Sequence, residues 1–220
     1  MIKKLFPLFL LLVVLVNNGI GFLNVDTERG ETLKSLSTSL SKKELEMQLE
    51  ENKSKKISEK MDYSSIEIPS IEAVKQAPEV DKQKIGGTLS IPTIDLNLNI
   101  LVGTNSVNML YGATTGLVGQ EMGKGNYVLF GHNMEQSGVL FSDLNQLKKG
   151  DKMTLTGEKN QTFTYEVSST FIVDKTAVEV LETSKEPVLT LITCSTVDKQ
   201  GKKVFAGSTP YRLVVVGTLK

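Results

Sequence analysis

The sequence is poor in the residues that most often carry chemistry. Its 220 residues contain one cysteine, one histidine and no tryptophan. A single cysteine excludes an intrachain disulfide, and one cysteine with one histidine excludes zinc sites built from several such ligands. The 25 basic and 25 acidic side chains cancel, so the chain lacks the basic footprint of a nucleic-acid-binding protein. The sequence also lacks the motifs of calcium loops and phosphate-binding loops.

The amino terminus carries the one long apolar run. Lys3 and Lys4 precede residues 5–23, which are apolar apart from two asparagines, a proline and two glycines. A charged start, an apolar core and small residues near the end fit a cleaved secretory signal. A run of about 18 to 20 apolar residues fits an uncleaved anchor instead. In either case residues 1–23 direct export, with the amino end held in the cytoplasm by the positive-inside bias.

Residues 24–84 are polar and typical of a stalk or linker. Four apolar residues in this region have heptad-like spacing, which predicts some helix: Leu33, Leu36, Leu40 and Met47. Lys43 and Glu50 interrupt that seam, so a short coiled coil and a solvated, partly helical linker both remain open. We predict a polar, partly helical stalk over residues 24–84.

From Ile85 onward the pattern of the sequence changes to short hydrophobic runs separated by Gly, Asn and Asp. Such runs predict strands, at residues 87–91, 96–102, 126–130, 151–156, 161–174, 188–193 and 211–219. Between them we expect a helical turn over residues 106–111, a flexible run over 112–125, and a short helix over 140–147 capped by Ser142 or Asp143. Many short strands with little helix predict an all-β domain over residues 85–220, closed or nearly closed into a barrel.

The strand that ends at Cys194 is the centre of the functional hypothesis. Residues 188–195 read Val-Leu-Thr-Leu-Ile-Thr-Cys-Ser, a pattern typical of a strand buried on both faces. Alternation places Cys194 on the face of Ile192, at the end of the strand. A thiol there is partly desolvated yet reachable, as a nucleophile must be. A buried structural cysteine fits the same strand.

His132 and Arg212 also lie at the ends of apolar strands. Each has a structural alternative, because a histidine can be satisfied inside a core and an arginine can extend to solvent along apolar neighbours. Together with Cys194 they supply the three groups that acyl transfer at a thiol needs. These groups are a nucleophile, a base that exchanges protons with the thiol and the leaving amine, and a positive donor for the oxyanion.

These residues resemble the sortases of Gram-positive bacteria. Residues 190–194 read Thr-Leu-Ile-Thr-Cys and match the Thr-Leu-x-Thr-Cys signature of class A; residues 130–133 read Phe-Gly-His-Asn, and Arg212 lies in a terminal valine-rich strand. The resemblance implies an eight-stranded sortase barrel with short helices. It also implies a cysteine transpeptidase in which Cys194 is the nucleophile, His132 the general acid/base and Arg212 the group that binds substrate and oxyanion.

By the same resemblance, the enzyme cleaves a Leu-Pro-x-Thr-Gly-like sorting signal between Thr and Gly and holds a thioacyl-enzyme. An amine of the cell-wall precursor, normally that of lipid II, then accepts the surface protein. The enzyme is expected on the outer side of the membrane, anchored through its N-terminus. Two alternatives remain: a specialised or pilin-polymerising sortase, and a non-catalytic surface barrel that binds peptide or wall.

The resemblance also implies where substrate and metal would bind. Val178, Val180 and Leu181, in the loop at residues 173–187, correspond to the apolar contacts of the signal, and Thr193 is expected to line the cleft beside the nucleophile. Some class A relatives bind calcium through acidic residues in two loops. Here Glu121 is alone in the first loop and Thr183 takes the place of the later carboxylate. Since calcium requires several oxygen ligands, we expect no metal and no cofactor.

Overall fold

The computed structural model describes residues 27–38, 40–52, 61–62, 67–207 and 209–220. The predicted anchor or signal, residues 1–23, lies outside the described residues. Within the described ranges, no helix combines the length and the apolar character that crossing a bilayer requires.

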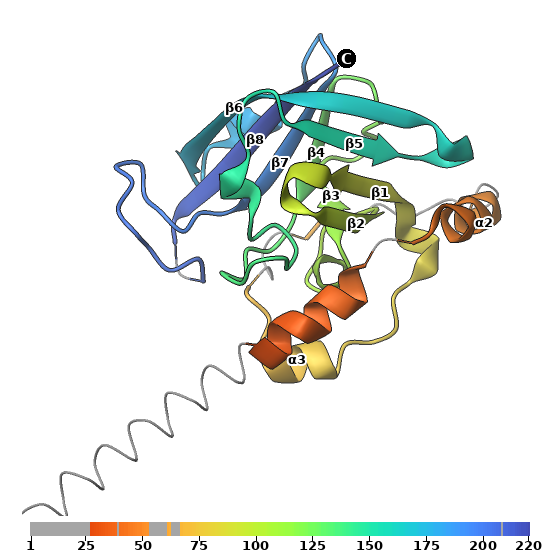
Figure 1. Cartoon of the computed structure of the whole chain (residues 1–220), viewed down its shortest axis with the longest axis horizontal. Coiled ribbons are helices and arrows are strands. Elements are labelled where there is room, and N and C mark those ends of the chain that lie inside the picture. Colours follow the sequence, from red (N-terminus) through yellow and green to blue (C-terminus); the bar gives the residue numbers. More distant parts are fainter. Residues whose placement is uncertain (1–26, 39, 53–60, 63–66, 208) are drawn as a thin grey trace, which may run out of the picture.

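Eight strands form a closed barrel (Figure 1), as the family resemblance implies. Around the barrel the strands follow the order β1-β2-β3-β4-β7-β8-β6-β5. The pairs β2/β3 and β4/β7 are parallel and the other pairs are antiparallel. The strands are β1 (Ile85–Ile91), β2 (Leu96–Leu101), β3 (Ala113–Thr115), β4 (Asn126–Phe130), β5 (Lys152–Thr156), β6 (Thr162–Asp174), β7 (Val188–Cys194) and β8 (Tyr211–Leu219).

The strands that form the candidate site are apolar on both faces. Successive side chains of a strand point to opposite faces, so Leu129, Leu191 and Val215 fill the barrel interior with the main core cluster. Their neighbours Val128, Ile192 and Val214 form a second buried cluster on the outer face, which we call the outer cluster. This double burial explains why these strands read as near-continuous hydrophobic runs rather than as alternating ones.

The structure differs from the predicted elements in the loops that flank β4. β3 lies inside the run expected to be flexible, and it is only three residues long. The helix predicted over residues 140–147 is wrong, because only a 3₁₀ turn at Leu144–Gln146 forms. Leu140 has a φ of 47°, outside the right-handed helical region. The carboxylate of Asp143 accepts a hydrogen bond from Gly138 N at 2.6 Å instead of capping a helix. The turn expected over 106–111 is present at Asn108–Leu110.

Helices in the region predicted as a stalk pack against the barrel (Figure 1). They comprise residues 27–37, α2 (Lys42–Asn52) and α3 (Ile71–Lys75). Leu33 is fully buried in the main core cluster, and Leu45 and Leu49 of α2 form a cluster with Ile85 of β1. Of the heptad-spaced residues, Leu33 is buried, Leu36 and Leu40 are partly buried against these clusters, and Met47 is 56% exposed. The domain boundary at residue 84 stays a prediction.

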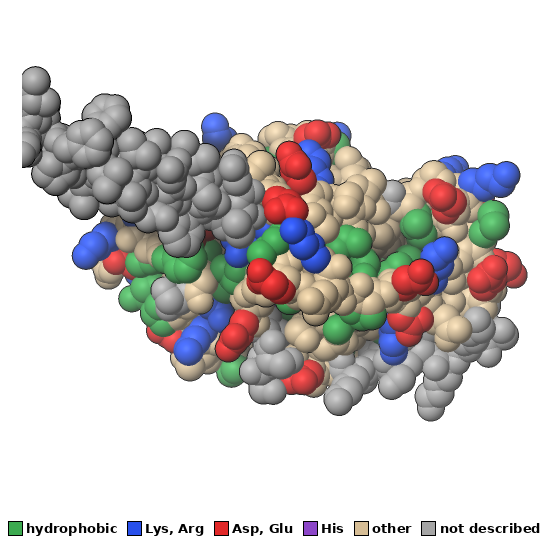
Figure 2. All heavy atoms as spheres, turned by 90° about the horizontal axis from the view of Figure 1, so that it is seen from below, with side chains coloured by type: hydrophobic (Ala, Val, Ile, Leu, Met, Phe, Trp, Pro, Cys, Tyr) green, Lys and Arg blue, Asp and Glu red, His purple; other side chains and the backbone are tan. Residues whose placement is uncertain are grey.

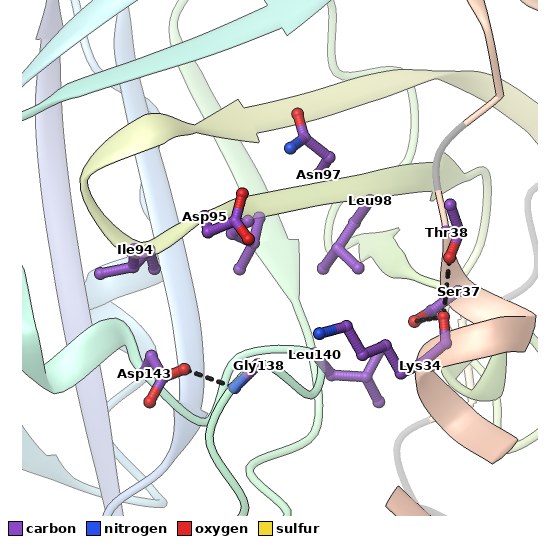
Figure 3. Close-up of a pocket in the computed structure, with 11 residues that line it drawn as sticks. Lys34, Ser37, Thr38, Ile94, Asp95, Asn97, Leu98, Gly138, Leu140 and Asp143 are labelled. Carbon is purple, nitrogen blue, oxygen red and sulfur yellow. Dashed lines mark hydrogen bonds between the residues drawn. The ribbon is translucent and has the colours of Figure 1, made fainter. Parts of the chain in front are cut away.

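Thr38 and Leu40, which follow the helix at residues 27–37, lie along β2. Thr38 forms an antiparallel bridge with Leu98, and the Asn99 side chain accepts a hydrogen bond from Leu40 N at 3.0 Å and donates one to Thr38 O at 3.1 Å. The helix, β2 and residues 138–143 enclose a cavity of about 190 Å³, into which Lys34 extends its ammonium group (Figure 3). The first helix therefore lies beside the loop that follows His132.

Charges of both signs share the face of the molecule that is seen from below the barrel. Basic and acidic side chains alternate there with apolar and uncharged ones (Figure 2). This mixed face reflects the equal numbers of the two signs in the sequence, and it produces no strong field of one sign.

The burial of Leu33 makes a prediction about stability. Replacing Leu33 by alanine should lower the free energy of unfolding by about 2–5 kcal/mol, because a fully buried leucine leaves a cavity. Met47→Ala, at an exposed position of α2, should change it by about 0.5 kcal/mol or less. Urea titration followed by circular dichroism measures both values. Equal, small shifts for the two variants would contradict the packing of the first helix on the barrel.

Candidate active site

The parallel pairing of β4 and β7 brings His132 and Cys194 to the same end of the barrel. Phe130 pairs with Ile192, and Gly131 N donates a hydrogen bond to Ile192 O at 3.2 Å. Extending this register by two residues places His132 beside Cys194. The predicted proximity of the histidine and the cysteine therefore follows from strand register, although the two residues are far apart in the sequence.

The antiparallel pairing of β7 and β8 places Arg212 directly opposite Cys194. Residues that face each other in an antiparallel pair share a face of the sheet. Here the shared face is that of Ile192 and Val214, both members of the outer cluster. The structure thus brings the three predicted catalytic residues to one end of the barrel, with Cys194 and Arg212 on its outer face. His132 is 4% exposed, whereas Cys194 and Arg212 are half-buried.

The loop between β6 and β7 covers the outer cluster. Val180 and Leu181, in the 3₁₀ turn Val178–Leu181, are partly buried against this cluster. Val178 in the same turn is 71% exposed. Val180 and Leu181 therefore line an apolar surface that leads to Cys194, and Val178 extends away from it into solvent.

Asn126, which the sequence analysis does not single out, holds this loop. Its amide nitrogen donates hydrogen bonds to Val180 O at 3.1 Å and Glu182 O at 2.9 Å, and its amide oxygen accepts one from the Thr190 hydroxyl at 2.7 Å. A polar residue at the start of an otherwise apolar strand is the signal that identifies such a position, because buried polar groups require partners.

Thr193 lies differently from the prediction that it lines the cleft. Alternation along β7 directs its side chain away from the face of Cys194, and the side chain is buried. Its hydroxyl donates a hydrogen bond to Gly131 O at 2.7 Å. Thr193 therefore fastens the segment that carries His132 to β7 from the interior side of the barrel.

Burial sets the protonation of the cysteine and the histidine. Desolvation lowers the pKa of His132 to about 4, because a buried imidazolium loses its hydration. Desolvation also raises the pKa of the Cys194 thiol, and the positive charge of Arg212 offsets part of that rise. At neutral pH both shifts favour a neutral pair, a thiol beside an unprotonated imidazole.

This neutral pair predicts how the thiol reacts with pH. Only the thiolate is nucleophilic, and the pKa of Cys194 is raised above its ordinary value of 9.0. The rate of alkylation by iodoacetamide should therefore rise with pH and reach its midpoint above that of free cysteine measured under the same conditions. A rate that is already at its plateau near neutral pH would indicate a thiolate–imidazolium pair and contradict this assignment.

The guanidinium of Arg212 is held by backbone carbonyls. Its Nη1 donates hydrogen bonds to Tyr211 O at 3.0 Å and to Thr209 O at 3.3 Å. Both hydrogen bonds come from one nitrogen, so Nη2 and Nε have no hydrogen-bond partner among the described residues. A guanidinium fixed in this way can present a planar pair of donors to an anion.

Metal-binding groups do not gather in the described part of the chain. No cluster of three or more His, Cys, Asp or Glu side chains there could hold a metal ion. Glu121, the one acidic residue of the loop before β4, forms an ion pair with Lys124 at 2.5 Å.

Comparisons with known proteins identify the family. The sortase domain family matches residues 89–220. The chain is 41% identical to sortase A of Listeria monocytogenes over 160 residues, which cover 72% of this chain and 68% of that protein. It is 42% identical to sortase A of Bacillus anthracis over 148 residues, which cover 67% and 70% respectively. The solved structure of the Listeria monocytogenes sortase A superposes with a TM-score of 0.56 at 38% identity, covering 62% of this chain and 88% of that one. The chain therefore belongs to the sortase family of cysteine transpeptidases.

Proposed function

We propose that Cys194, His132 and Arg212 form the catalytic centre of this transpeptidase, and that its substrate is a Leu-Pro-x-Thr-Gly-like sorting signal. The observation that carries the proposal is strand register. β7 aligns Cys194 with Arg212 on one side and with the segment bearing His132 on the other. Sulfur, imidazole and guanidinium on one rim are the groups that acyl transfer requires.

The first half-reaction forms a thioacyl-enzyme. Sγ of Cys194 attacks the carbonyl carbon between Thr and Gly of the signal while its proton passes to the imidazole of His132. Arg212 donates hydrogen bonds to the oxygen that becomes negative. His132 then returns the proton to the departing glycine amine, and the carbon–nitrogen bond breaks. Because thiol and imidazole both start neutral, neither of these two groups has to hold a charge while buried before substrate arrives.

The second half-reaction transfers the acyl group to an amine. The acceptor nitrogen attacks the thioester and gives its proton to His132, and the thiolate that leaves is reprotonated from the imidazole. The net change is the exchange of one amide for another. We propose an amine of the lipid II type as the acceptor and a surface protein as the acyl donor.

The apolar surface beside Cys194 fits the apolar part of such a signal. Val180 and Leu181, together with the outer cluster, offer an apolar surface, on which leucine and proline side chains lose water favourably. Val178, which is 71% exposed, stays a proposed contact of the signal. We further propose that residues 1–23 anchor the chain in the membrane, so that the barrel works on the outer side.

A peptide assay tests this function. The full-length chain in detergent, mixed with a quenched Leu-Pro-x-Thr-Gly peptide and an oligoglycine amine, should release the fluorophore and form a ligated product. A peptide with the threonine and glycine exchanged serves as the control and should not be cleaved. Preference for a lysine side chain over oligoglycine would favour a pilin-polymerising enzyme. No cleavage by a folded chain whose cysteine is alkylated readily would contradict the proposed substrate.

A further inference from the structure

We propose that Asn133 is a positioning residue, which holds the catalytic histidine against the nucleophile by bonding to the carbonyl of Cys194. The inference rests on the proposed catalytic roles of His132 and Cys194. Asn133 follows His132 directly in the chain, and its side chain is 3% exposed.

The side chain of Asn133 bridges two segments. Its Nδ2 donates a hydrogen bond to Cys194 O at 2.9 Å, and its Oδ1 accepts one from Glu135 N at 2.9 Å. Its backbone forms a bridge with Leu140 on the far side of the loop. A buried amide with both ends paired has a fixed orientation, so the carbonyl of the nucleophile and the loop after His132 are held at a fixed separation.

Hydrogen bonds to β7 therefore flank His132 on both sides. Before it, Gly131 donates through N to Ile192 O at 3.2 Å and accepts through O from Thr193 Oγ1 at 2.7 Å. After it, Asn133 donates to Cys194 O. The carbonyl of His132 itself accepts a hydrogen bond from Phe141 N at 2.9 Å, within its own loop. Removing the Asn133 bond would therefore leave the residue before His132, but not the residue after it, bonded to β7.

The peptide unit between Cys194 and Ser195 is held from the opposite side as well. Ser195 N donates a hydrogen bond to Tyr211 O at 3.1 Å, and the same oxygen accepts from Nη1 of Arg212 at 3.0 Å. This peptide unit therefore links the histidine loop, through Asn133, to the strand that carries the arginine. Asn133 is the contact on the histidine side, and the hydrogen-bond partners of its side chain are backbone groups.

Three variants test this role. Asn133→Ala should lower kcat about 10- to 100-fold with little change in KM, since a misplacement of about 1 Å between reacting groups can cost that much. Asn108→Ala is the matched control, because Asn108 is also buried and donates from Nδ2 to Gly103 O at 2.7 Å and Val102 O at 3.3 Å. Asn108→Ala should lower thermal stability by a similar amount and leave kcat within about twofold. The reason is that the contacts of Asn108 lie away from the end of the barrel that carries Cys194, His132 and Arg212.

Asn133→Asp separates positioning from general stability. The aspartate keeps an acceptor for Glu135 N but turns a carboxylate oxygen toward Cys194 O. When protonated it can donate to that carbonyl again, and burial beside a carbonyl raises its pKa. The ratio of the kcat values of Asn133→Asp and the wild type should therefore increase as pH falls.

The outcomes are distinct. An unchanged kcat in Asn133→Ala, an equal loss of kcat in Asn108→Ala, or a ratio for Asn133→Asp that does not vary with pH would each overturn the positioning role. A folded wild-type chain that does not cleave the peptide would instead overturn the proposed function, and this inference with it.

Discussion

Cys194→Ala is expected to abolish cleavage of the sorting peptide, with a loss of kcat on the order of 10⁵–10⁶-fold, as for other enzymes that lose their nucleophile. The reason is chemical, because without sulfur no thioacyl intermediate can form and the amine has nothing to resolve. Fluorescence release from the quenched peptide measures the loss, and intact-protein mass spectrometry should find no adduct on the variant.

The structure suggests that this variant folds. Cys194 is half-buried at the end of β7. The hydrogen bonds of the following peptide unit, from Asn133 to Cys194 O and from Ser195 N to Tyr211 O, do not depend on the thiol. The midpoint of thermal unfolding should therefore stay close to that of the wild type. Turnover within about tenfold of the wild type would remove Cys194 from the role of nucleophile.

Arg212→Lys is expected to lower kcat/KM by about 10²–10³-fold, the usual cost of losing one oxyanion donor. Lysine keeps the charge but not the planar fork. It cannot hold Tyr211 O and Thr209 O through one nitrogen and present further donors in a fixed plane. Steady-state kinetics with the quenched peptide measures the loss.

Arg29 provides the matched control, since it is the other arginine of the sequence. It lies in the first helix, where its Nη1 is 3.5 Å from Pro69 O. Arg29→Lys should leave kcat/KM within about twofold. Full activity in Arg212→Lys would remove the oxyanion role from Arg212, whereas equal losses in both variants would indicate a general effect on folding.

The barrel could be predicted because strand periodicity is local. Runs such as those of β4, β7 and β8 are apolar on both faces, and this is visible in any short window of sequence. β3 was missed because a strand of three residues gives too short a pattern. The helix predicted over residues 140–147 does not form, because Leu140 has a left-handed backbone conformation. The apolar spacing of the sequence does not reveal that conformation.

The proximity of Cys194, His132 and Arg212 could be predicted because each lies at a strand end, and closing a barrel brings strand ends together; their catalytic roles stay a proposal. Thr193 was assigned to the cleft from family resemblance, although alternation from Cys194 already placed it on the opposite face. For Thr193 the alternation of side chains along the strand agrees with the structure, and the family resemblance does not. Asn126 and Asn133 could not be assigned from sequence, because their partners are backbone groups of distant segments.

The protonation state of Cys194 and His132 before substrate binds could not be inferred from sequence either. A pKa shift depends on how much solvent a group loses, and the burial of His132 arises only in the folded barrel. The same limit applies to residues 24–84, where the leucine spacing predicts helix but does not say what the helix packs against. The contacts of Leu33 and Leu45 show that these helices pack against the barrel.

Cys194, His132 and Arg212 are proposed to act on a single carbonyl. The most direct test is rapid-quench mass spectrometry of the full-length chain with the sorting peptide and without added amine. The expected result is an adduct on Cys194 equal in mass to the peptide up to its threonine. The adduct should disappear when oligoglycine is added and should form far more slowly in Arg212→Lys. Cleavage with no adduct, or an adduct on another residue, would contradict a catalytic centre at this rim.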